Sequence, residues 1–98
     1  MRKSAVPVPF LPAEYEVADA AAIQALLRGD ASPHQQQRAM KWIIEVCAAT
    51  YDQSFYPGGE DGRRNTDFAE GRRFVGSQIV KMTRINTSKM RREDNDQA

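Results

Sequence analysis

The 98-residue sequence has very few of the side chains on which metal sites and disulfides depend. It contains one cysteine, Cys47, and one histidine, His34. A single cysteine cannot form an intrachain disulfide, and the two residues together cannot supply the four nitrogen or sulfur ligands of a structural zinc site. We therefore expect no metal and no cofactor, and a cytoplasmic setting is the default for a chain with so little cysteine.

Long apolar runs are also missing. The chain begins MRKSAVPVPFLP, in which a charged start is followed by a short apolar stretch interrupted by Pro7, Pro9 and Pro12. Neither a secretory signal nor a membrane helix tolerates this pattern well. We therefore expect no membrane association.

The same alternation of proline with apolar residues favours an extended arm over residues 1–13. Its apolar side chains, which are the candidate docking residues of the arm, are Val6, Val8, Phe10 and Leu11. Because loose apolar residues are unfavourable in water, the arm is expected either to pack across its own domain or to reach into a neighbouring subunit.

The amino-acid sequence shows no arrangement of side chains that is typical of a catalytic site. His34 and Cys47 lie thirteen residues apart on one predicted helix, nearly four turns, so they cannot form a nucleophile–base pair. Cys47 falls on an apolar stripe and is expected in the core. The three glycines Gly58, Gly59 and Gly62 match no phosphate-binding loop. The sequence therefore predicts a protein that is not an enzyme.

Apolar periodicity and capping signals predict an all-α fold, a compact three-helix bundle over residues 14–86. The helices are expected at about 14–28, 33–50 and 66–85, with a capping box at Ser32 and Gln35 and a long loop from Asp52 to Asn65. Residues 87–98 are expected to form a flexible charged tail, or a helical extension that orders on a partner. The helix-packing candidates are Trp42, Phe68, Gly71, Val75 and Gly76.

The net charge of +1 hides an uneven distribution. Nine basic and two acidic residues between Arg63 and Arg92 give that stretch a local charge of +7. Guanidinium groups bind phosphate or carboxylate bidentately, so the basic side chains are candidate contacts to a partner or to phosphate. They are Arg63, Arg64, Arg72, Arg73, Lys81 and Arg84. The alternative is that they are solvated, or paired within the chain.

Two blocks of sequence carry a resemblance to a known group of proteins. They are ASPHQQQRAMKWIIEVCAATYDQSFYP (31–57) and DFAEGRRFVGSQIVKM (67–82), the second of which is the more specific. Together they resemble a family of small uncharacterised proteins of podovirus-type tailed bacteriophages, encoded among head, portal and packaging genes. The resemblance implies a helical protein and supplies no catalytic residues.

With the resemblance, the expected function is that of a non-enzymatic interaction protein in virion assembly, associated with the phage head or portal. Its partners would be phage virion or packaging proteins, or further copies of the chain, in the host cytoplasm during assembly or in the virion. The alternative is a small DNA-binding packaging or regulatory protein that uses the basic stretch from Arg63 to Arg92. An inhibitor of a host enzyme is a further alternative.

Overall fold

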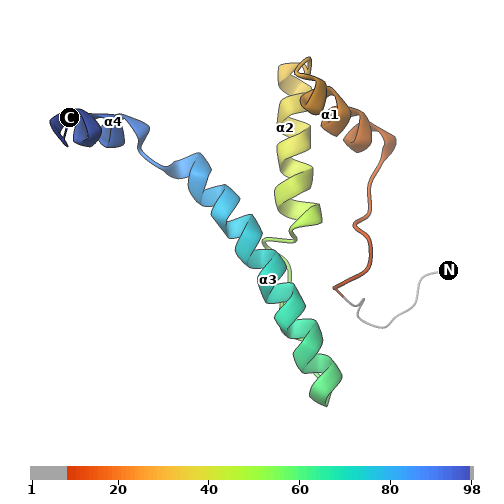
Figure 1. Ribbon diagram of the computed structural model, residues 1–98. Helices are drawn as coiled ribbons and strands as arrows, with labels where there is room; N and C mark the ends of the chain where they lie inside the picture. The colour runs from red at the N-terminus through yellow and green to blue at the C-terminus, as the bar shows by residue number, and fades with distance from the viewer. Residues whose placement is uncertain (1–8, 98) are drawn as a thin grey trace.

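A computed structural model describes the backbone of residues 9–97 and the side chains of residues 9–92, so Val6 and Val8 lie outside the described residues. The described part forms four α-helices and one π-helical segment, with no strand, and this confirms the all-α fold class (Figure 1). The elements are α1 (Val17–Arg28), α2 (Pro33–Lys41), η1 (Trp42–Cys47), α3 (Gly59–Arg84) and α4 (Thr87–Gln97).

Helices α1 and α2 form a hairpin with a capping motif at each adjoining end. Glu16 and Asp19 form a capping box at the start of α1, three residues later than predicted. Gly29, with φ of 81°, ends α1 in the left-handed conformation that glycine adopts without a steric penalty. The predicted capping box of α2 is confirmed, since Ser32 N donates to Gln35 Oε1 (3.0 Å) and Gln35 N donates to Ser32 Oγ (3.1 Å).

The predicted helix 33–50 is α-helical only to Lys41 and continues as the π-helical segment η1. A π-helical turn holds one more residue than an α-helical turn, so it rotates the following side chains away from the positions that an α-helical pattern predicts. Cys47 is accordingly exposed, and the expectation that it lies in the core is wrong. Directly after η1, Ala49 has a φ of 50°, in the left-handed region that residues other than glycine adopt infrequently.

Helix α3 begins at Gly59, so the predicted loop is wrong for residues 59–65. The glycines there suggested a turn, but Gly62 is buried inside the helix. A Cβ at Gly62 would lie 2.5 Å from the carbonyl carbon of Pro57, so the glycine permits the preceding segment to fold back onto the helix. Thr66 holds the same segment, because its Oγ1 accepts a hydrogen bond from Tyr56 N (2.8 Å).

Residues Thr87–Gln97, expected as a flexible tail, form helix α4. A short break at Ile85 and Asn86 separates it from α3, and the Asn86 side chain accepts a hydrogen bond from Lys89 N at its start (2.9 Å). The alternative of a helical extension therefore describes this segment better. None of the helices in residues 9–97 is long and apolar enough to cross a membrane.

The buried core is small and consists mainly of small side chains. Its apolar members are Ala22, Ala25, Ala39, Ala48, Ala49 and Ala69. No large side chain in the described part is fully buried. The radius of gyration is 17.7 Å, against about 13 Å for a compact domain of 100 residues. Helix α1 packs on α2, and η1 is the helical element that α3 chiefly contacts, so a compact three-helix bundle is not confirmed (Figure 1).

Candidate functional site

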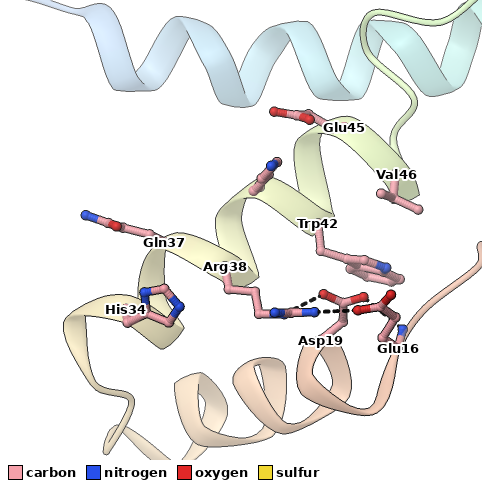
Figure 2. A pocket seen from close by; sticks show the side chains of 9 residues that line it. Glu16, Asp19, His34, Gln37, Arg38, Trp42, Glu45 and Val46 are labelled. Atoms are coloured by element: carbon pink, nitrogen blue, oxygen red, sulfur yellow. Dashed lines mark hydrogen bonds and ion pairs between the residues drawn. The ribbon is translucent and has the colours of Figure 1, made fainter.

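An ion-pair cluster joins the two helices of the hairpin. Arg38, on α2, donates from Nε to Asp19 Oδ1 (2.8 Å) and from its Nη2 to Glu16 Oε1 (2.9 Å), and both acidic residues belong to the start of α1 (Figure 2). Trp42 adds a further link, because its indole N–H donates to the carbonyl of Glu14 (2.9 Å). The cluster lines an open pocket of about 440 Å³ and fixes how the chain enters α1.

The electrostatics of this cluster follow from its hydrogen bonds. The pKa of Asp19 is lowered, first by the bond from Glu16 N (2.9 Å) and then by Arg38, against the opposing effect of burial. The pKa of Arg38 is raised, chiefly by its bond to Asp19. With the Asp19 side chain only 16% exposed, the pair is better shielded from water than the Arg28–Asp30 pair, whose side chains are about 60% exposed.

The lowered pKa of Asp19 predicts a specific loss of stability in acid. Because the folded-state pKa lies below the ordinary value of 3.8, the stabilisation is fully present above that value and is lost as the pH falls through the folded-state pKa. We expect Asp19→Asn to unfold more easily than the unsubstituted protein at neutral pH and to lose less of its remaining stability on acidification. Urea unfolding between neutral and acidic pH measures both effects.

Asp30→Asn is the matched control for this prediction, since it alters an exposed ion pair at the other end of α1. We expect little change in its unfolding free energy or in its pH dependence. If Asp19→Asn gave the same acid profile as Asp30→Asn and the unsubstituted protein, the contacts of the Asp19 carboxylate with Glu16 N and Arg38 would contribute nothing to the pH dependence of folding.

The arginine doublet of α3 attaches two other segments to that helix. Arg72 donates from Nη1 to the carbonyl of Pro9 (2.7 Å), and its guanidinium carbon lies 5.9 Å from the centre of the Phe68 ring. Phe10 meets Phe68 edge to face, with ring centres 6.3 Å apart. Pro9 and Phe10 thus contact α3 of their own chain, but Phe10 (58%) and Leu11 (54%) both remain exposed.

Arg73 and Gly76 hold the segment that follows η1. Arg73 donates from Nε to the carbonyl of Thr50 (3.1 Å) and pairs with Glu70 (3.4 Å). Gly76 is buried at the point where this segment crosses α3, and a Cβ there would collide with Thr50 Oγ1. Thr50 itself donates from Oγ1 to the carbonyl of Ile44 (2.7 Å). Arg73 and Gly76 therefore make contacts within the chain, whereas the sequence alone did not show whether such residues contact a partner, the solvent or the chain itself.

The six basic candidates therefore divide into two sets. Arg72 and Arg73 are partly buried and engaged within the chain. The other four are exposed on α3 and form no ion pair within residues 9–92: Arg63, Arg64, Lys81 and Arg84. Only this second set is free to contact an external anion.

The residues predicted to pack between helices also fall into two groups, one buried or partly buried and one exposed. Gly76 is buried and Trp42 is partly buried, whereas the side chains of Phe68 and Val75 are 49% and 55% exposed. Gly71 is exposed, and a Cβ at this position would meet nothing within 4 Å. The close packing expected at Gly71 and Val75 is thus not made within the described chain.

Sequence reasoning missed the pairing of Arg38 with Asp19 and Glu16, and the role of Thr50. No local spacing in the sequence indicates these contacts, because the residues that pair are 19 to 23 positions apart. Within the described residues, no three His, Cys, Asp or Glu side chains are grouped as ligands of a metal ion.

No family model, curated protein or solved structure matches this chain. What the chain can do is therefore argued from its own surface. The described surface offers hydrogen-bonding cations and many large apolar side chains, both of which suit binding to other macromolecules.

Proposed function

We propose that this chain is a non-enzymatic interaction protein of a bacteriophage, which acts in virion assembly by docking its helices on protein partners. One observation carries the protein-binding part of the proposal. Large apolar side chains remain exposed throughout residues 9–92 while the core is filled by alanine. The phage setting rests on the resemblance of residues 31–57 and 67–82 to the phage family.

The most exposed large apolar side chains of the hairpin belong to α1. Val17 is 84% exposed and Leu27 is 88% exposed, near the two ends of the helix. An open hollow of about 310 Å³ on the hairpin is lined by residues that include Tyr15, Ile23 and Trp42. Burial of such side chains is what stabilises protein–protein contacts, at about 25 cal/mol for each Å² of apolar surface removed from water. The hairpin is therefore the proposed contact to virion proteins.

Light scattering coupled to size-exclusion chromatography tests this proposal. The purified chain is mixed with the portal protein and, separately, with the large terminase subunit of the same phage. We expect a complex with one of them, and we expect Leu27→Glu to weaken it. Gln37→Glu, at an exposed position of α2, is the control and should bind normally. A chain that binds neither protein would contradict the proposal.

A second candidate function is binding of DNA, and it is favoured by the exposed cations of α3. Arg63, Lys81 and Arg84 project without a carboxylate partner in the described part of the chain. Phosphate contacts release counterions, so the logarithm of the affinity should fall with the logarithm of salt concentration by about 0.9 for each phosphate neutralised. A gel shift with duplex DNA at low and moderate salt tests this, and Arg63→Gln with Lys81→Gln should reduce the slope.

A further inference from the structure

The contact between Pro9 and α3 includes a buried donor that has no acceptor. Arg72 donates from Nη1 to the carbonyl of Pro9 (2.7 Å), but its Nε is buried and has no hydrogen-bond partner among the described residues. Buried donors are almost always paired, so this contact is incomplete as described. Residues 1–8 adjoin Pro9 in the sequence and carry backbone carbonyl groups that can supply the acceptor.

A hollow of about 540 Å³ on α3 begins at the same contact. Its lining residues are Phe10, Asp61, Arg64, Asn65 and Phe68. At 100° per residue, Asp61, Phe68 and Arg72 lie within about 40° of one another, so the hollow follows one side of α3 from the arginine toward the start of the helix. The rings of Phe10 and Phe68 contact each other but remain 58% and 49% exposed. An apolar segment laid in this hollow would cover both rings.

The sequence of residues 1–8 suits such a hollow. Val6 and Val8 are apolar, and each precedes a proline. A residue before proline is disfavoured in the helical region and is restricted to extended conformations, while the proline ring fixes its own φ. A segment restricted in this way loses less conformational entropy when it binds than a flexible one does. The stretch from Val6 to Pro9 is therefore suited to lie along a helix in an extended form.

Charge selects the direction in which the segment runs. Residues 1–8 contain Arg2 and Lys3 and no acidic residue. The first turn of α3 carries Glu60 and Asp61, neither of which forms an ion pair with a described side chain. In the other direction, residues 71–84 of α3 include four basic side chains and no acidic one. A cationic segment that leaves Pro9 is thus attracted toward the start of α3 and repelled from its end.

The length of the segment agrees with this direction. Asp61 lies about 16 Å from Arg72 along the helix axis. Lys3 precedes Pro9 by about 19 Å of extended chain, so it reaches the acidic first turn. We propose that residues 1–8 dock on α3 of their own chain, along the hollow from Arg72 to the first turn of the helix. This contact ties the start of the α1–α2 hairpin to α3, and it concerns a different surface from the α1 hollow.

Disulfide trapping in the full chain tests the position and the direction, with Cys47→Ser in every variant because Cys47 is exposed. Val6 precedes Pro9 by about 9 Å of extended chain. Asn65 and Ile79 are both partly buried and lie about 10 Å from Arg72, on either side of it along one face of α3. Under mild oxidation we expect Val6→Cys with Asn65→Cys to form an intrachain disulfide at least about tenfold faster than Val6→Cys with Ile79→Cys, because docking raises the effective concentration of the first pair.

Three outcomes would overturn the proposal. Equal rates for the two pairs would show that residues 1–8 do not dock on α3. A faster reaction with Ile79→Cys would show that the segment runs toward the end of the helix. A covalent dimer in place of the intrachain product, in dilute solution, would show that the segment occupies the hollow of a second copy. None of these outcomes depends on whether the chain binds the portal or terminase protein, so the proposed function is tested separately.

An exchange of charge gives an independent measurement. In the protein with Val6→Cys and Asn65→Cys, we expect Asp61→Lys to slow trapping about two- to fivefold, the range of an exposed ion pair, with helical content preserved in circular dichroism. Adding Lys3→Asp should restore the rate. Asp67→Lys makes the same change about 120° round the helix from Asp61 and should have little effect. Equal slowing by Asp61→Lys and Asp67→Lys, or a rate that Lys3→Asp does not restore, would contradict the proposal.

Discussion

Gly76→Ala is expected to lower the free energy of unfolding by about 2 kcal/mol, although alanine is the better helix former. A new Cβ would collide with Thr50 Oγ1 and would lie 3.0 Å from the Cβ of Ala48, so the segment after η1 would have to move away from α3. Overpacking of this kind costs about 3 kcal/mol at the upper end of its usual range, and helix propensity returns about 1 kcal/mol. Chemical denaturation followed by circular dichroism measures the net loss.

Ser77→Ala is the control for this prediction, because Ser77 is the next residue of α3 and is exposed. It should change stability by no more than about 0.5 kcal/mol. A double-mutant cycle with Thr50→Ala isolates the contact, since that substitution removes the Oγ1 with which the new Cβ collides. Gly76→Ala should therefore cost less in the Thr50→Ala background. Equal costs in both backgrounds would show that the crossing at Gly76 is not the source of the effect.

The capping signals of the first two helices could be read from the sequence because they are local. Ser32 and Gln35 satisfy each other's backbone groups across three residues, and Gly29 ends α1 through its own conformational freedom. Neither depends on the rest of the fold. The end of α1 and the start of α2 were accordingly predicted at the residues where the structure has them.

The start of α3 could not be predicted in the same way. Gly58, Gly59 and Gly62 favour a turn when each is considered alone. Only the folded chain shows that Gly62 is needed where Tyr56 and Pro57 pass across the helix. A glycine selected for close approach and a glycine selected for a turn are identical in the sequence, so the distinction requires the tertiary contact.

The sequence predicted which basic residues belong to the candidate site, but it did not predict which of them bind other parts of the chain and which remain exposed. The basic residues of α3 were identified, yet periodicity could not show that Arg72 holds Pro9 and Arg73 holds Thr50, while Lys81 stays exposed. Apolar periodicity likewise predicted a packed position for Val75, whereas this residue is 55% exposed in the folded chain. Helical spacing shows which residues share one face of a helix, but it does not show whether the rest of the chain covers that face.

The alanine core of the hairpin predicts a second large effect. Ala22 and Ala25 are the buried residues of α1 and Ala39 is that of α2, and none is more than 2% exposed. Small side chains here let the two helices approach closely. Ala39→Leu would add three carbon atoms to this contact and should lower the free energy of unfolding by about 1 to 3 kcal/mol.

A contact between helices that consists of methyl groups has no room for the added volume of leucine. We therefore expect Ala39→Leu to move α1 away from α2 as it lowers the free energy of unfolding. Hydrogen exchange should therefore quicken in α1 more than in α3, which meets the rest of the chain elsewhere. Gln37→Leu, at an exposed position of α2, introduces the same side chain without the contact and should leave exchange in α1 unchanged. If Ala39→Leu were as stable as the unsubstituted chain, leucine would fit between the helices, and the alanine core would not be what sets their spacing.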